Sequence, residues 1–116
     1  MLTPEEKVKL AVAALEEKKG NRITVLDVRN ITVICDYFVI VSGDNDRQVT
    51  ALCDEADEKL GRAGAEKKNV EGYHTGDWIL LDYGDVIIHV FSKEAREYYD
   101  LERIWRDAKK VVAADL

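Results

Sequence analysis

The feature that most constrains this fold is an uninterrupted apolar run at residues 37–41, Tyr-Phe-Val-Ile-Val. Such a run is typical of a strand that is buried on both faces. Ser42 and Gly43 follow immediately and allow a sharp turn, and either Asp44 or Asp46 can cap a helix behind that turn. A strand, a turn, a helix and another apolar strand form the order of a crossover unit. The sequence therefore predicts an α/β fold.

Two further stretches have the signals of long helices. Thr3 can cap a helix, Pro4 suits its first position, and Glu6 completes a capping box. The apolar spacing behind this start predicts a helix over residues 4–18 that stops at Gly20. The helix after residue 43 has an apolar stripe and glycine stops of its own: Val49, Leu52, Cys53, Ala56 and Leu60, then Gly61 and Gly64.

The C-terminal part also has helical spacing. Ser92 can cap a short helix that runs through Tyr99, and Asp100 can cap a longer one. The stripe of this last helix consists of Leu101, Ile104, Trp105, Ala108 and Val111 or Val112. We therefore expect the chain to end in a helix.

Strand patterns fill the intervening segments. Residues 23–28 are rich in β-branched side chains, and residues 67–72 can form a short edge strand. Residues 78–83 and 86–91 are two apolar strands, and the Gly-Asp pair at 84–85 between them is a two-residue hairpin signal.

The chain length allows one domain. With 116 residues and no linker or internal repeat, we expect a single α/β domain over residues 1–116 with α-β-α layers. Its central sheet is predicted to be mixed, with four to five strands and helices packed on it, in the order α-β-β-α-(β)-β-β-α.

The charge of the chain favours a basic protein partner over nucleic acid. There are 17 basic and 23 acidic residues, which give a net charge of −6, and nucleic-acid modules usually carry a basic excess. The acidic excess lies in residues 44–58, net −5, and in residues 71–102, net −6. The second segment also contains six aromatic residues: Tyr73, Trp78, Tyr83, Phe91, Tyr98 and Tyr99. Aromatic residues within an acidic segment predict a protein-binding surface.

No residue pattern indicates catalysis. His74 lies in a glycine-containing loop at residues 71–76, and His89 lies within a strand, where a hydrogen bond to a neighbour is favoured over a catalytic role. Cys35 and Cys53 match no disulfide or metal-ligand spacing, so we expect reduced, partly buried thiols. The sequence predicts a protein that is not an enzyme.

The signals for a ligand are weak. The Ser-Gly turn at 42–43 could direct backbone N–H groups at an anion, but no glycine-rich phosphate motif is present and Asp44 and Asp46 would repel phosphate. Asp82 and Asp85 flank the hairpin turn, but two carboxylates without a third ligand nearby are a poor Mg²⁺ site. We expect no cofactor and no metal.

The ends and apolar runs of the chain indicate no contact with a membrane. The first ten residues are charged and lack an apolar signal core, and no apolar run approaches the ~20 residues that span a bilayer. We expect a soluble, cytoplasmic protein.

The strand at residues 78–83 has large apolar groups on both faces. Alternation puts Trp78, Leu80 and Asp82 on one face and Ile79, Leu81 and Tyr83 on the other. Either helices cover both faces, or one face is left for a partner or a second subunit. The pattern alone supports the two arrangements about equally.

Several segments recur in the order of a known family. They are residues 36–43 (DYFVIVSG), 47–49, 71–72, 78–91 (WILLDYGDVIIHVF) and 99–105. Together they resemble the ribosomal silencing factor family, also called the Iojap-like family. The resemblance runs from about Leu10 to Trp105.

This resemblance implies a function. Members bind ribosomal protein uL14 on the large (50S) ribosomal subunit, obstruct association with the small subunit, and repress translation when nutrients are scarce. Related organelle proteins assist assembly of the large subunit. The resemblance also implies a nucleotidyltransferase-like fold without established transferase activity, little direct contact with RNA, and a homodimer when the protein is free.

The resemblance also implies which residues contact uL14. They are Trp78, Leu81, Asp82, Tyr83, Gly84, Asp85, His89 and Glu102. Trp78 and Tyr83 are the expected anchors, and the three carboxylates are the expected partners for Lys or Arg. Other roles are open: Trp78 and Leu81 can belong to the core, and Glu102 can pair with Arg106 at helical spacing. Asn45 stands where many members have Ser, which weakens any ligand role for a hydroxyl at that turn.

Two alternative functions stand beside silencing. One is an adaptor for large-subunit assembly, which would use the same contact. The other is a nucleotide-binding enzyme like the nucleotidyltransferases, in which the Ser42-Gly43 turn would act together with Asp82.

Overall fold

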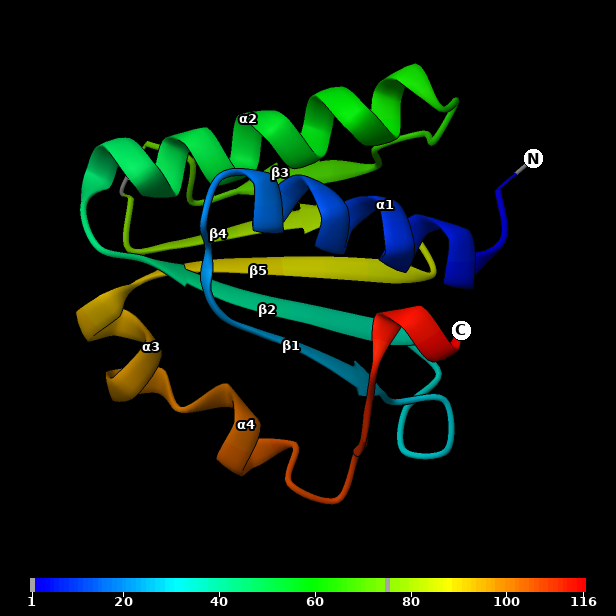
Figure 1. Cartoon of the computed structure of the whole chain (residues 1–116). Coiled ribbons are helices and arrows are strands. Elements are labelled where there is room, and N and C mark those ends of the chain that lie inside the picture. The colour runs from blue at the N-terminus through cyan, green and yellow to red at the C-terminus, as the bar shows by residue number, and fades with distance from the viewer. Residues whose placement is uncertain (1, 75) are drawn as a thin grey trace.

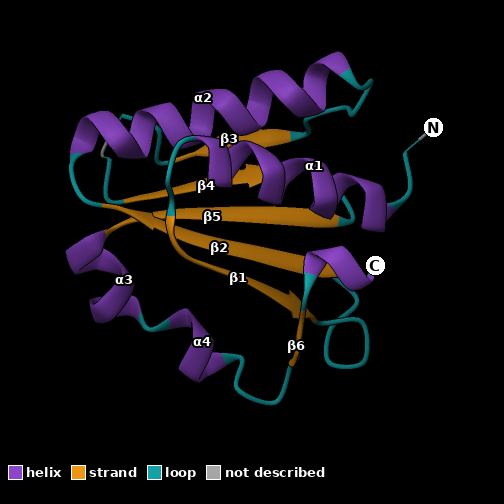
Figure 2. Cartoon of the chain, in the orientation of Figure 1, coloured by secondary structure: helices purple, strands orange, loops and turns teal. Residues whose placement is uncertain are grey.

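A computed structural model describes residues 2–74 and 76–116; the loop predicted at 71–76 thus includes one position, residue 75, outside the described residues. The helices are α1 (Pro4–Glu17), α2 (Asp46–Arg62), α3 (Lys93–Tyr99), α4 (Leu101–Ile104) and the 3₁₀ helix η1 (Ala113–Asp115). The strands are β1 (Asn21–Asp27), β2 (Tyr37–Gly43), β3 (Asn69–Glu71), β4 (Trp78–Asp82), β5 (Val86–Ser92) and β6 (Lys109–Val111). They form one mixed sheet in the order β3-β4-β5-β2-β1-β6 (Figures 1 and 2).

The centre of the sheet is the predicted buried strand β2. It pairs with β5 in parallel along its whole length, from Tyr37 opposite Val86 to Gly43 opposite Ser92. Every residue of both strands is buried. The crossover that joins them passes through α2, β3 and β4, so the parallel partner of β2 is β5. The next apolar strand in sequence, β4, lies beyond β5 and is antiparallel to it.

The two faces of the sheet are covered unequally. α1 and α2 lie side by side over one face, whereas the short helices α3 and α4 lie on the other side (Figure 1). The predicted stripe of α2 is confirmed, because each of its five residues is buried in the core on the α1/α2 side. A second core on the other side includes Phe38, Phe91 and Leu101, with Trp78 and Trp105 packed at its margin.

Capping side chains set the starts of the long helices. Thr3 and Glu6 form the predicted capping box at the start of α1. At α2 the cap is Asn45 and not Asp44 or Asp46: its side chain accepts a hydrogen bond of 2.8 Å from the backbone N–H of Gln48. α2 continues through Gly61, and the chain leaves it at Gly64, where φ is +95°. A polar side chain is therefore needed at position 45, and Asn45 meets this need.

The C-terminal segment differs from the prediction. Ser92 caps α3 as expected, but α4 ends at Ile104, and Asp100 has φ +46° with no side-chain capping bond. Residues Lys109–Val111 instead form β6, which pairs with the outer edge of β1. The helical spacing of the apolar residues is misleading here, because the unpaired edge of β1 offers backbone partners that no local pattern reveals. The sheet thus has six strands, not four to five. Among the described residues, no helix has the length and apolar character needed to cross a membrane.

Glycine is required at position 72, where the chain turns toward β4. Gly72 has φ +80°, and a Cβ there would collide with the backbone carbonyl oxygen of Trp78. Gly64 has φ +95° and no atom within 4 Å of a Cβ. The two glycines share a left-handed backbone, and only Gly72 has a steric conflict.

We expect Gly64→Ala to lower the free energy of unfolding by about 1–2 kcal/mol, the usual cost of a left-handed non-glycine residue. Gly72→Ala should cost more than about 3 kcal/mol, because the clash with a backbone atom adds to that strain. Urea unfolding of both variants measures the difference. Equal losses would show that the turn relaxes and that its approach to Trp78 is not required.

Candidate docking site on the second sheet face

Strand β4 divides its side chains between a covered and a partly covered face. Ile79, Leu81 and Tyr83 pack in the core on the α1/α2 side and are at most 2% exposed. Trp78, Leu80 and Asp82 lie on the other face and are half-buried. Helices therefore cover one face of β4 completely and the other only in part. The sequence left open whether helices cover both faces; full cover of both is not observed, and a partner on the half-covered face stays a prediction.

Leu81 and Tyr83, two of the predicted contact residues, belong to the core. The Tyr83 hydroxyl donates a 2.8 Å hydrogen bond to Asp57 Oδ1 on α2, and burial raises the pKa of this tyrosine. Their inward direction follows from strand alternation. Of the two predicted anchors, Trp78 reaches the surface and Tyr83 does not.

Trp78 is held by a hydrogen bond to His89. Its indole Nε1–H donates to His89 Nδ1 at 3.1 Å. His89 is 4% exposed, and burial lowers its pKa to about 4. The interpretation of His89 as a strand histidine bonded to a neighbour is therefore confirmed, and this side chain does not lie at the surface.

Aromatic rings pack around this pair. The Trp78 ring lies 4.8 Å from Tyr99 and 5.1 Å from Phe91 between centroids, and the His89 ring lies 4.8 Å from Phe38. Tyr99 is part of α3, so the position of α3 determines how the tyrosine ring packs against the indole of Trp78. The six aromatic residues of the acidic segment are thus divided: Tyr83 and Phe91 are buried, Trp78 is half-buried, and Tyr73, Tyr98 and Tyr99 are exposed.

The two aspartates of the β4–β5 hairpin have different partners. Asp82 Oδ1 accepts the backbone N–H of Gly84 at 2.8 Å, and Gly84 has φ +89°, as a tight turn requires. Asp85 forms a 2.8 Å ion pair with Lys7 Nζ of α1, which also donates to the Tyr83 carbonyl oxygen. Asp85 thus ties the hairpin to α1. Asp82 stays on the half-covered face with one oxygen bonded to the turn.

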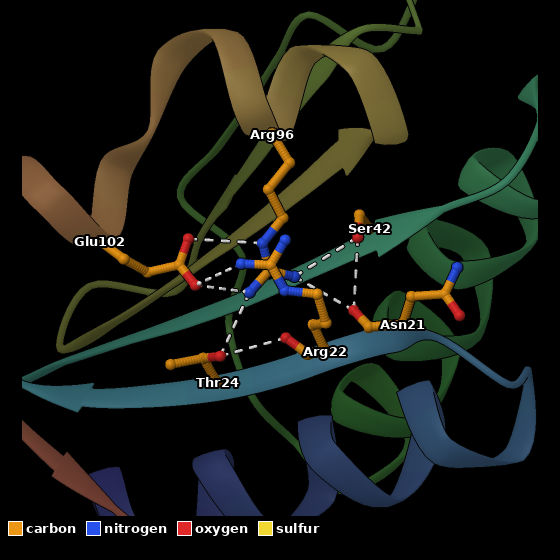
Figure 3. A network of polar contacts seen from close by, with 6 residues as sticks. All are labelled: Asn21, Arg22, Thr24, Ser42, Arg96 and Glu102. Carbon is orange, nitrogen blue, oxygen red and sulfur yellow. Dashed lines mark hydrogen bonds and ion pairs between the residues drawn. The ribbon is translucent and has the colours of Figure 1, made fainter.

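Glu102 is engaged inside the protein (Figure 3). The buried guanidinium of Arg96, 2% exposed, donates to both carboxylate oxygens of Glu102, at 2.7 and 3.4 Å, and Arg22 adds a 3.6 Å ion pair. Burial acts to raise the pKa of Glu102, but the hydrogen bond from Arg96 and the positive charges of Arg96, Arg22 and Lys110 together outweigh it, so the pKa lies below its ordinary value. The alternative pairing with Arg106 is wrong, because α4 ends before it could bring the two side chains together.

Arg96 also bonds to the ends of the two neighbouring strands. Its remaining donors reach the Asn21 carbonyl oxygen at 3.1 Å, Thr24 Oγ1 at 3.2 Å and Ser42 Oγ at 3.4 Å. Figure 3 shows the guanidinium between β1, β2 and Glu102. This network fixes the segment that follows α3 against the sheet, and with it the position of Tyr99.

The structure separates the residues that motivated a nucleotide site. Asp82 lies in register with Ile87 of β5 and, through it, with Phe38 of β2. Phe38 is four positions, or about 13 Å, from Ser42 along β2, and Asp82 lies two strands further across the sheet. Ser42 is in addition bonded to Arg96. Within residues 2–74 and 76–116, no group of three or more His, Cys, Asp or Glu side chains could hold a metal ion.

Both cysteines are buried and free. Burial raises the pKa of the Cys35 and Cys53 thiols to about 12, so neither forms a reactive thiolate near neutral pH. The thiols are free, as expected, and they are more completely buried than the expected partial burial.

One exposed apolar feature was not predicted. Ile31, Val33 and Ile34 protrude from the loop between β1 and β2, and Val33 is fully exposed. This loop joins the hairpin, because the backbone N–H groups of Asp36 and Tyr37 both donate to the Asp85 carbonyl oxygen. The sequence signal for this feature was a group of three aliphatic residues in a segment for which no helix or strand was predicted.

Comparison with known proteins places this fold in a family. The family described as "Ribosomal silencing factor during starvation" matches residues 2–116. The chain belongs to the ribosomal silencing factor family. A ribosomal silencing factor of Halalkalibacterium halodurans is 39% identical over 110 residues, which cover 95% of this chain and 94% of the relative.

The silencing-factor fold is also seen in a solved structure. A crystal structure of a protein from Chromobacterium violaceum superposes with a TM-score of 0.87 at 39% identity, covering 90% of this chain and 87% of that one. A mouse protein named for mitochondrial assembly of the ribosomal large subunit is 30% identical over 101 residues, 84% of this chain and 44% of its own length. The resemblance inferred from the motifs is confirmed, and the family name describes a regulatory role.

Removing Glu102 tests whether its role is structural. We expect Glu102→Ala to lower the free energy of unfolding by about 3 kcal/mol, because it leaves the buried Arg96 guanidinium without its carboxylate. Glu97→Ala, at an exposed position on α3, should change stability by less than about 0.5 kcal/mol. Thermal and urea unfolding measure both variants. If Glu102→Ala is as stable as Glu97→Ala, the carboxylate is not a structural partner of Arg96.

Proposed function

We propose that this protein silences ribosomes by binding ribosomal protein uL14 on the large subunit and blocking association with the small subunit. Membership of the silencing-factor family supports this role. We choose the docking surface because one face of β4 is only half covered, and Trp78, Leu80 and Asp82 lie side by side on that face. We call these three residues the β4 row.

The β4 row has the composition of a docking surface. Trp78 offers a large apolar ring in a fixed position, and tryptophan is among the residues that carry the most binding energy in interfaces. Leu80 adds apolar area, and Asp82 adds a negative charge within a segment of net charge −6. Ribosomal proteins are generally basic, so the row complements such a partner in charge and in apolar character.

Silencing by this route needs no catalytic group. A protein bound to the large subunit where the small subunit must dock excludes it by volume. The two bound states are mutually exclusive, so tight binding of one shifts the equilibrium away from the other. Contact through a ribosomal protein also explains how an acidic chain can act on a particle rich in RNA phosphate.

Substitutions in the β4 row test the proposal. We expect Trp78→Ala to weaken binding to purified uL14 at least about 30-fold, as loss of a central anchor does. Asp82→Asn keeps the acceptor for the Gly84 N–H and removes the charge. It should slow association about fivefold at low salt, and the difference should shrink as salt rises. Binding kinetics and formation of 70S particles from separate subunits are the two measurements.

The matched control is Glu58→Gln, which removes a charge on α2 in the opposite layer. It should bind uL14 and block subunit joining as the wild type does. Normal binding by folded Trp78→Ala and Asp82→Asn would refute the choice of surface. Failure of the wild type to bind uL14 or to reduce 70S formation would refute the function.

A role in large-subunit assembly is the second candidate, and the name of the mouse relative favours it. Both roles would use the same contact, so binding experiments do not separate them. Sedimentation profiles of a deletion strain do. Large-subunit precursors that accumulate during growth indicate assembly, whereas a defect confined to starvation indicates silencing.

We also propose that the free protein is a cytoplasmic homodimer, as the family resemblance implies. Sedimentation equilibrium over a range of concentrations tests the oligomeric state. A monomer at all concentrations up to those in the cell would contradict the dimer and leave the uL14 contact unaffected.

A further inference from the structure

His89 is a buried polar residue in largely apolar surroundings. It occupies a central position of β5, between Leu80 of β4 and Ile40 of β2 in register, and 4% of it is exposed. Rings of Phe38, Trp78 and Phe91 surround it. An apolar side chain of similar size would suit such surroundings better, because burial of a polar ring is costly.

The hydrogen bond to Trp78 defines the tautomer of His89. The indole N–H can only donate, so Nδ1 must be the acceptor and must carry no proton. Burial keeps the ring neutral near neutral pH, so the single proton is on Nε2. His89 Nε2 is buried and has no hydrogen-bond partner among the described residues.

An unpartnered buried N–H is destabilising, and its presence calls for an explanation. Among the described residues, the one hydrogen-bond partner of the His89 side chain is Trp78, which belongs to the β4 row. Trp78 is half-buried, so without this acceptor its N–H could turn toward water and the indole could adopt another rotamer. The imidazole thus selects one orientation of the ring.

We propose that His89 is a positioning residue for partner binding: its neutral imidazole accepts the Trp78 N–H and fixes the indole in the orientation that docks on the large-subunit protein. His89 itself does not touch the partner. Tyr99 and Phe91 hold the other sides of the ring. A preorganised anchor loses less conformational freedom on binding than a mobile one, and this raises affinity. The inference rests on the function proposed above.

Two substitutions separate positioning from core packing. His89→Leu has nearly the volume of histidine and no acceptor. His89→Asn is smaller, but its Oδ1 is attached to Cγ as Nδ1 is and can accept the Trp78 N–H. A packing role predicts that Leu preserves both stability and binding better than Asn. The positioning role predicts the opposite order for binding.

We expect His89→Leu to weaken binding to uL14 about tenfold, the effect of losing one hydrogen bond that sets an anchor. His89→Asn should bind within about threefold of the wild type although it is the less stable variant. In a Trp78→Phe background, which has no indole N–H, His89→Leu should change affinity by less than about twofold. Calorimetric binding and urea unfolding are measured on all variants.

NMR of the free protein gives a readout that requires no partner. Trp105→Phe assigns the two indole N–H signals. The Trp78 signal should shift and exchange faster with water in His89→Leu and keep its wild-type behaviour in His89→Asn. An unchanged Trp78 signal in His89→Leu, or binding by His89→Leu equal to wild type, would overturn the positioning role while uL14 binding stands. Failure of the wild type to bind uL14 would overturn the proposed function, and this role with it.

Discussion

The parallel pairing of β2 with β5 is the constraint on which the rest of the molecule depends. Both strands are buried on both faces, so each face of the sheet must carry a layer. Two parallel neighbours also need a long connection, and here it contains α2, β3 and β4. The chain therefore provides one cover for the sheet and a hairpin partner for β5 within a single crossover.

The half-covered face follows from the unequal lengths of the two layers. α1 and α2 are long and cover one face of the sheet, whereas α3 and α4 are short. Ala95 of α3 and Leu101 of α4 are buried in the second core, but Trp78 and Leu80 of β4 stay half-buried at its margin. The buried Arg96 compensates for the small area of this second layer. It binds Glu102 and the ends of β1 and β2, and it secures Tyr99 against the half-buried Trp78. The polar network and the docking surface are thus two parts of one arrangement.

Local patterns predicted the parts of the fold that local chemistry determines. The capping box at Thr3, the buried stripe of α2 and the turn at Gly84 could all be read from spacing and residue type. β6 could not, because its pairing with β1 depends on an edge that lies about eighty residues away in sequence.

The candidate site was predicted in part for the same reason. Alternation correctly divided β4 into two faces, but only the three-dimensional packing shows that the Tyr83 face is the covered one. Glu102 looked like a surface carboxylate because no pattern signals a buried arginine beneath it. The sequence predicted that His89 is hydrogen-bonded to a neighbour within a strand. Identifying Trp78 as that neighbour required the cross-strand geometry.

Site-specific photocrosslinking on isolated large subunits tests the central claim most directly. A photoreactive side chain is placed at Leu80 in the β4 row and, in a second variant, at Glu58 on α2. We predict that the probe at position 80 links to uL14 and that the probe at position 58 does not. Linkage of uL14 from position 58, or linkage from position 80 only to other ribosomal components, would contradict the claim that the half-covered face of β4 is the docking surface.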